Sequence, residues 1–157
     1  MVDLPLEGGC RCGRVRFRVT EAPLLETVCH CRGCQQMTGS AYSTTVTVPT
    51  NGFSVTEGQA VVGGLHSDEF DHMHCDWCKS WVFTQPREDI GFVNVRATML
   101  DDPSWFSPWM ETQTAEMLPW AQTGSVRSYP RFPEMADYAR LTEEYREDRP
   151  FTDRKAN

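Results

Sequence analysis

The cysteines constrain this chain more than any other feature of its sequence. There are seven of them, and every one belongs to a short spaced group. The groups are a C-x-C pair, a C-x-C-x-x-C triplet and a C-x-x-C pair, formed by Cys10 and Cys12, by Cys29, Cys31 and Cys34, and by Cys75 and Cys78. Such spacings place two or more thiolates on one metal ion. The pattern therefore predicts metal sites within the fold.

Two other uses of cysteine explain the pattern less completely. A disulfide framework would leave one of seven thiols unpaired, and the N-terminus lacks the basic and long apolar segments of an export signal. We therefore expect a cytoplasmic protein with reduced thiols. A redox function for Cys75-Asp76-Trp77-Cys78 would leave the other five cysteines without a role. Metal binding accounts for all of them.

Zinc is the metal expected, because it favours four tetrahedral ligands and accepts thiolate sulfur. The triplet can hold one ion by itself and leave one position open for water, substrate or a substrate thiolate. The two pairs can then meet across the fold and close a second site. Such a closed site supplies roughly 10–16 kcal/mol of binding free energy that acts as folding free energy. We predict two zinc ions per chain, a structural ion on Cys10, Cys12, Cys75 and Cys78 and a catalytic or labile ion on Cys29, Cys31 and Cys34.

His30 is a weaker candidate than the cysteines beside it. A C-x-C pair in a strand places both side chains on one face, because the side-chain period of a strand is two, and we expect this of Cys10 and Cys12 as well as of Cys29 and Cys31. His30 would then point away from the ion held by Cys29 and Cys31. It stays a weak candidate for a catalytic, proton-handling residue, with Tyr42 and Glu111 as alternatives by residue type alone. A packed or solvated ring is the default interpretation.

Outside the cysteine groups, the sequence is typical of a mainly β protein with one late helix. Apolar residues alternate at Val15, Phe17 and Val19, which predicts a strand over 14–20 with one buried face. Further strands are expected at 24–31, 41–48, 53–56, 71–75, 80–84, 90–97 and 108–113, a short helical piece at 33–37, and a loop at 124–133. Met135, Tyr138, Leu141 and Tyr145 form one helical stripe, which predicts a helix over about 134–148 that docks on the sheet or on another subunit. We expect one domain, 1–157, with its core at about 7–135.

The charge balance excludes some partners. The formal net charge is −7, and no apolar run approaches the ~20 residues that span a bilayer, so neither nucleic acid nor a membrane is expected as a partner. An anionic substrate would need a local arginine, and Arg14, Arg32 and Arg131 are the candidates. The tryptophans could wall a pocket, although core packing is the default for most of them: Trp77, Trp81, Trp105, Trp109 and Trp120.

The contexts of the cysteines resemble a known family. The segment 8–17 reads GGCRCGRVRF, 29–34 reads CHCRGC, and 75–78 reads CDWC. In this order they resemble the glutathione-dependent formaldehyde-activating enzyme (GFA) family, which also contains centromere protein V, over roughly residues 7–135. Weaker similarity continues at 118–120 and 130–133. The family usually has glycine directly after the last C-x-x-C, where this chain has Lys79.

The resemblance implies a β-tent of twisted antiparallel sheets, two zinc ions, and the same four-plus-three division of the cysteines that ligand counting gives. It also implies carbon–sulfur chemistry on a glutathione–formaldehyde adduct. The leading hypothesis is a zinc-dependent carbon–sulfur lyase or synthase of the S-(hydroxymethyl)glutathione synthase type. The alternative is a non-enzymatic thiol carrier or a zinc-dependent protein-interaction module, because no convincing acid–base pair is visible. A small thiol such as glutathione is the expected partner, and a homo-oligomer is compatible with the sequence.

Overall fold

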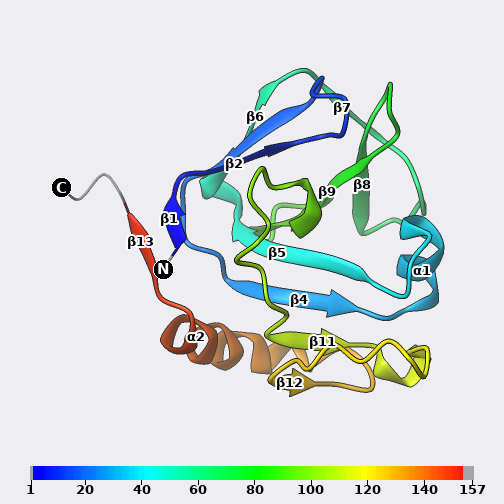
Figure 1. Cartoon of the computed structure of the whole chain (residues 1–157), viewed down its shortest axis with the longest axis vertical. Coiled ribbons are helices and arrows are strands. Elements are labelled where there is room, and N and C mark those ends of the chain that lie inside the picture. Colours follow the sequence, from blue (N-terminus) through cyan, green and yellow to red (C-terminus); the bar gives the residue numbers. More distant parts are fainter. Residues whose placement is uncertain (1, 154–157) are drawn as a thin grey trace.

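Three β-sheets form the framework of the chain that this computed structural model describes, residues 2–153 (Figure 1). The strands are β1 (Val2–Leu4), β2 (Leu6–Gly9), β3 (Arg16–Val19), β4 (Leu25–Cys29), β5 (Ser43–Pro49), β6 (Phe53–Glu57), β7 (Ala60–Val62), β8 (Phe70–Cys75), β9 (Trp81–Pro86), β10 (Phe92–Arg96), β11 (Met110–Thr112), β12 (Arg127–Ser128) and β13 (Phe151–Asp153). The helices are α1 (Arg32–Thr38) and α2 (Tyr138–Asp148), with the 3-10 turns η1 (Thr50–Gly52), η2 (Ala97–Met99), η3 (Thr114–Glu116) and η4 (Met135–Asp137). The predicted mainly β class and the late helix are confirmed.

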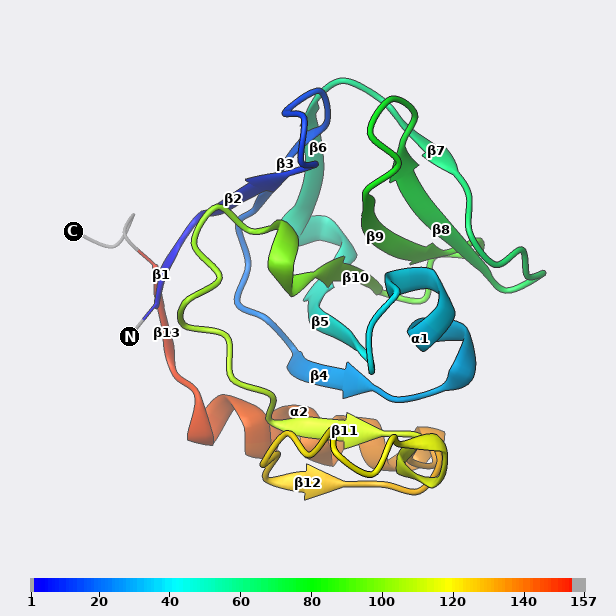
Figure 2. The same cartoon turned by 45° about the vertical axis from the view of Figure 1, so that its right-hand side comes forward.

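The largest sheet has eight strands in the order β12-β11-β4-β5-β10-β9-β8-β7, and the second is β2-β3-β6. Most neighbouring strands are antiparallel, as expected, but the sheets are mixed. Strand β11 runs parallel to both β4 and β12, and β1 runs parallel to β13. Parallel strands cannot be joined by a tight hairpin turn, and β11 is joined to β12 by the segment 113–126. In Figure 2 the segment 97–109, which follows β10, passes near β2 and then descends to the start of β11.

The middle of the large sheet has one apolar face and one polar face. Val46 and Val48 of β5 and Val93 and Val95 of β10 are each at most 4% exposed and belong to the main core. The residues between them face the other way, because successive side chains alternate across a strand. On that face Thr45 pairs with Arg96 and Thr47 pairs with Asn94. Period-two alternation therefore separates a packed side of the sheet from a side that carries polar groups.

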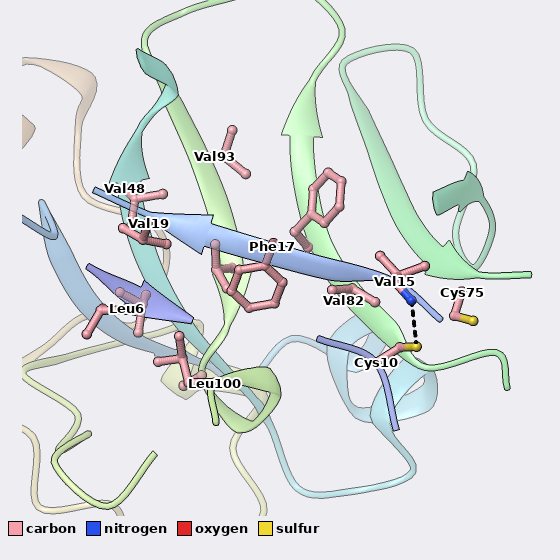
Figure 3. Packing of buried hydrophobic residues seen from close by; sticks show 14 of the residues in the cluster. Leu6, Cys10, Val15, Phe17, Val19, Val48, Cys75, Val82, Val93 and Leu100 are labelled. Atoms are coloured by element: carbon pink, nitrogen blue, oxygen red, sulfur yellow. Dashed lines mark hydrogen bonds between the residues drawn. The ribbon is translucent and has the colours of Figure 1, made fainter. Parts of the chain in front are cut away.

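The three-stranded sheet packs on the apolar face. Val15, Phe17 and Val19 are at most 1% exposed, which confirms the alternation predicted for this segment. Figure 3 shows these side chains directed toward Val48, Val82 and Val93 of the large sheet. Full burial of one such apolar side chain contributes about 1.5–3 kcal/mol to folding. Cys10 and Cys75 lie at the end of the same core cluster.

Helix α2 docks against the edge of the large sheet near β4 and β11 (Figure 1). Leu141 and Tyr145 are fully buried and pack with Leu25, Trp109 and Met110, so the predicted stripe is a docking face within the chain. Met135 is 77% exposed, and the segment before Tyr138 is the 3-10 turn η4, so the α-helix begins later than predicted. Among residues 2–153, no helix is long and apolar enough to cross a membrane.

Candidate metal centres

The first centre brings together four cysteines from distant parts of the chain. The Sγ atoms of Cys10, Cys12, Cys75 and Cys78 all lie within 4.8 Å of one another. The Cys10–Cys12 Sγ separation is 3.5 Å and the Cys12–Cys75 separation is 3.7 Å. A tetrahedron with metal–sulfur bonds of about 2.3 Å has edges of about 3.8 Å, so these thiols have the spacing of a four-thiolate metal site.

Two tight turns position these four thiols. In the first, Gly13 N donates to Cys10 O at 2.9 Å, and Val15 N donates to Cys10 Sγ at 3.3 Å (Figure 3). In the second, which joins β8 to β9, Lys79 N donates to Cys75 O at 3.0 Å. The expectation that Cys10 and Cys12 share one face of a strand was wrong, because β2 ends at Gly9 and the pair lies in the turn. The turn brings the sulfurs together by curling the backbone around them.

The second centre is formed where β4 ends and α1 begins. Cys29 is the last residue of β4, Cys31 is the N-cap of α1, and Cys34 lies in the first turn of the helix. Their Sγ atoms also lie within 4.8 Å of one another. Cys34 N donates to Cys31 Sγ at 3.3 Å, and Ser43 Oγ of β5 donates to Cys34 Sγ at 3.1 Å. The sequence triplet is therefore one compact cluster with three sulfur ligands.

The three thiols interact strongly when no metal is bound. Hydrogen bonds from the Cys29 and Cys34 thiols, and from the backbone amides of Cys34 and Gly33, lower the pKa of the Cys31 thiol to about 2. Hydrogen bonds with Cys31 and Cys34, together with burial, raise the pKa of the Cys29 thiol far above its usual range. Negative charge on one sulfur therefore opposes ionisation of its neighbours, and a bound cation would relieve this repulsion. This electrostatic pattern fits a divalent cation that binds several thiolates.

His30 lies between two of these thiols but points elsewhere. Its ring is fully buried, its Nε2 lies 3.2 Å from Glu111 Oε2, and its edge meets the Tyr42 ring with centroids 5.4 Å apart. His30 N also donates to Thr112 O, at 3.0 Å. The three residues that the sequence offered by type alone are therefore neighbours around one imidazole. His30 does not contribute to the cysteine cluster, as expected, although Cys31 lies at a helix cap rather than in the strand.

Glu111 also accepts hydrogen bonds from residues other than His30. Thr123 Oγ1 donates to Glu111 Oε2 at 2.7 Å. Although partial burial opposes ionisation, hydrogen bonds from Thr123, Ser128 and His30 lower the pKa of Glu111. The Glu111 carboxylate on β11 therefore faces the His30 ring and helps to fix its orientation.

The arginines that the sequence offered for an anionic substrate lie in different places. Arg14 stacks over the exposed Trp77, with Cζ 4.3 Å from the ring centroid, on the four-cysteine side. The side chains of Arg131 and Glu116 form an ion pair at 3.2 Å, and the backbone N of Arg32 donates to the same carboxylate. None of these three is buried. Sequence reasoning missed Arg96, which is only 6% exposed and lies on the polar face of the large sheet.

A cavity of about 420 Å³ lies near both centres, because two residues of its wall contact cysteines. Ser80 Oγ lies 3.2 Å from Cys78 Sγ, and Thr38 Oγ1 donates to Cys34 O at 2.8 Å. The walls of the cavity come from the segments 37–44, 79–81 and 96–99. Arg96 and Trp81 line it together. The volume lies within the range of small-molecule sites, about 300–1,000 Å³.

Comparison with known proteins places this architecture in a family. The family model described as glutathione-dependent formaldehyde-activating enzyme matches residues 5–116, so the chain belongs to the GFA family. A crystal structure of a Rhodobacter sphaeroides protein is similar in fold, with a TM-score of 0.50 and 20% sequence identity over 60% of this chain and 87% of that chain. No curated protein matches the sequence. The family and the two cysteine clusters agree with the resemblance seen in the sequence.

Proposed function

We propose that this protein is a zinc-dependent carbon–sulfur lyase or synthase that acts on adducts of a small thiol and an aldehyde, such as S-hydroxymethylglutathione. One observation carries the proposal, namely that a cluster of only three thiols lies apart from a closed cluster of four. The proposal includes a single zinc-binding domain over 1–157, of which Met1 and 154–157 lie outside the described residues. Seven reduced thiols favour a cytoplasmic location.

The four-cysteine cluster suits a structural role. Cys10 and Cys75 are 5% and 1% exposed and are part of the hydrophobic core. Four thiolates complete the tetrahedral shell of a zinc ion, so no position remains for a substrate. The site would tie the turn after β2 to the turn after β8, which are separated by more than sixty residues of sequence. We infer that this ion holds the fold.

The three-cysteine cluster suits the capture of a thiol. A zinc ion there would supply one free coordination position for a substrate thiolate, and its three thiolate ligands would make it a poor Lewis acid for activating water. Ser43 donates to Cys34 Sγ and so disperses part of the thiolate charge. His30 anchors the Cys29–Cys31 segment to β11 through its backbone N and its ring. The chain thereby fixes the three sulfurs on one side of the free position.

The proposed reaction is balanced without a redox partner. In the synthase direction the thiol loses its proton, its sulfur forms a bond to the aldehyde carbon, and the carbonyl oxygen takes up a proton. The lyase direction reverses each change. His30 stays the candidate for holding a proton near the cluster, because its Nε2 faces Glu111 and its Nδ1 has no protein partner. Its full burial suits a proton-holding role more than direct contact with the substrate.

A second candidate function is thiol binding without catalysis. One observation favours it: the residues that line the cavity beside the clusters include no carboxylate and no imidazole. A carrier needs no group that moves a proton during the reaction. The two functions therefore differ in rate acceleration and agree in thiol binding.

The test is an exchange measurement on the metal-loaded protein. Exchange NMR would follow formaldehyde and glutathione with native protein and with Cys31→Ser, while metal analysis counts the zinc in each. We expect two zinc ions and accelerated exchange in the native protein, and one zinc ion and no acceleration in the variant. Saturable glutathione binding without acceleration would assign the carrier function. The absence of both binding and acceleration, or two zinc ions in Cys31→Ser, would refute the proposed site.

A further inference from the structure

We propose that Arg96 is the anchor for a carboxylate of the bound thiol, so that the site selects anionic thiols over neutral ones. This inference rests on the proposed thiol capture at the three-cysteine cluster and names the substrate class of that site. It is carried by a buried guanidinium without an anionic partner, placed in a cavity beside the cluster.

The burial of Arg96 is unusual for its lack of a counter-charge. Its side chain is 6% exposed, and no ion pair among residues 2–153 includes it. Its Nε has no hydrogen-bond partner, and Nη2 donates only to Asn94 O at 3.3 Å. Buried charges in proteins are normally paired, because an unpaired one forfeits its hydration. The Arg96 guanidinium is therefore free to pair with an anionic group of a bound ligand.

The guanidinium is held in a fixed orientation. Its Cζ lies 4.2 Å from the centroid of the Trp81 ring, so one face of the planar group is covered. Trp81 is fixed in turn by a hydrogen bond from its Nε1 to Thr84 Oγ1 at 3.0 Å. Burial lowers the pKa of Arg96 to about 10, so the group stays charged at neutral pH. A planar fork with its face covered presents its edge, and this edge matches the two oxygens of a carboxylate.

Strand register places Arg96 near the open cysteine cluster. Arg96 on β10 pairs with Thr45 on β5, and Ser43, two residues before Thr45, donates to Cys34 Sγ. Residues i and i+2 of a strand share a face, and so do directly paired residues. Arg96 and Ser43 are therefore diagonal neighbours on the same face, with Cα atoms about 8 Å apart. Negative charge on Cys34 or Cys29 raises the pKa of Arg96, so the cluster lies within electrostatic reach of the guanidinium. A thiol whose sulfur sits at the cluster can therefore reach Arg96 with a carboxylate several bonds away.

The charges around the cavity point the same way. The cavity wall carries two cations, Arg96 and Lys79, and no carboxylate. Lys79 is 70% exposed and pairs with Asp76, so it lies at the rim. In a chain with 22 acidic and 15 basic residues, a wall with this composition is a local exception. It attracts anions despite the net charge of the protein.

A rival role for Arg96 is to balance the charge of the metal-bound thiolates. Three thiolates and a divalent ion carry a net charge of about −1, and a nearby cation would favour them. In that case Arg96 would hold the metal and would not distinguish an anionic thiol from a neutral one. The two roles therefore predict different binding selectivity and different metal content.

The test compares two thiols that differ in one group. Isothermal titration would measure the binding of 6-mercaptohexanoate and of its neutral amide, 6-mercaptohexanamide, to the zinc-loaded native protein and to Arg96→Gln. We expect the native protein to bind the carboxylate at least tenfold more tightly than the amide, and Arg96→Gln to bind both with similar affinity. We also expect Arg96→Gln to retain two zinc ions and an unchanged affinity for the amide. Arg18→Gln is the matched control, because Arg18 is exposed and pairs with Glu7 on the distant three-stranded sheet.

Each other outcome overturns the proposal in a recognisable way. Equal affinities in the native protein would refute the anchor and leave thiol capture standing. Loss of one zinc ion in Arg96→Gln would assign the charge-balancing role instead. Failure of the native protein to bind either thiol would refute thiol capture itself and the anchor with it. If Arg96→Gln does not fold, Arg96→Lys replaces it, since it keeps the charge without the planar fork, and its selectivity should fall between that of the native protein and unity.

Discussion

The contact between α2 and the large sheet includes a buried hydrogen bond that Tyr145→Phe would remove. Tyr145 Oη donates to Glu26 Oε1 at 2.9 Å, and the two side chains are 0% and 1% exposed. Ser107 N donates to the other carboxylate oxygen at 2.8 Å. Phenylalanine would keep the ring in contact with Trp109 while one oxygen of Glu26 loses its partner. The substitution therefore isolates a single polar contact.

The expected effect depends on pH. A hydrogen bond to a charged group contributes about 1.5–3 kcal/mol and one to a neutral group about 1 kcal/mol, so the free energy of unfolding should fall by about 2 kcal/mol when Glu26 is ionised and by about 1 kcal/mol when it is protonated. Burial raises the pKa of Glu26 above 4.5, and Tyr145 opposes this rise. The folded state therefore holds the Glu26 proton more tightly than the unfolded state, and stability from this group is lost as pH increases above 4.5. Tyr145→Phe steepens that loss.

Urea unfolding at a series of pH values from about 5 to 8, with saturating zinc, would measure the difference between the native protein and the variant. Tyr138→Phe is the control, because Tyr138 belongs to the same helix and is only half-buried, with no hydrogen bond to Glu26. The reasoning is refuted if Tyr145→Phe changes the free energy of unfolding no more than Tyr138→Phe does, or if its effect is largest at the acid end.

Two further predictions concern the metal turns. Cys75→Ser should lose one zinc ion together with the cooperative unfolding transition, whereas Cys31→Ser should lose one zinc ion and keep that transition. Metal analysis and circular dichroism would measure both effects. Equal loss of structure in the two variants would contradict the division into a structural and an open site. Lys79 has φ 58°, a left-handed conformation that costs a residue with a Cβ about 1–2 kcal/mol. Lys79→Gly should therefore raise the free energy of unfolding by about 1 kcal/mol. Lys79→Ala keeps the Cβ and removes the exposed pair with Asp76, so it should not raise the free energy of unfolding.

Local patterns in the sequence carried much of the fold and of the candidate site. The alternation at Val15, Phe17 and Val19 predicts their burial correctly, because every second side chain of this segment faces the core. The spacing of the cysteines predicts their division into a cluster of four and a cluster of three, because a metal ion needs a fixed number of ligands and short spacings bring sulfurs together. The left-handed φ at Lys79 also explains why glycine suits that position after the last C-x-x-C.

Other features depend on contacts that no local pattern contains. The short strand β12 lies in a segment expected to be loop, and it forms because β11 offers it a parallel edge. Met135 fits the helical stripe but stays exposed, because the chain enters α2 through a 3-10 turn. Arg96 follows the alternation of β10, yet its burial arises from Trp81 on another strand. Tertiary neighbours decided each of these.

The two faces of the large sheet carry different kinds of residues, and substitutions on them have different consequences. Cys10 and Cys75 lie with the valines of the apolar face, whereas Ser43 and Arg96 lie on the polar one. Substitutions at Thr47 or Asn94 alter the polar side, where these residues share a hydrogen bond at 2.8 Å, without touching the packed core. A change on the polar face can therefore leave the packed cysteines and valines of the other face in place.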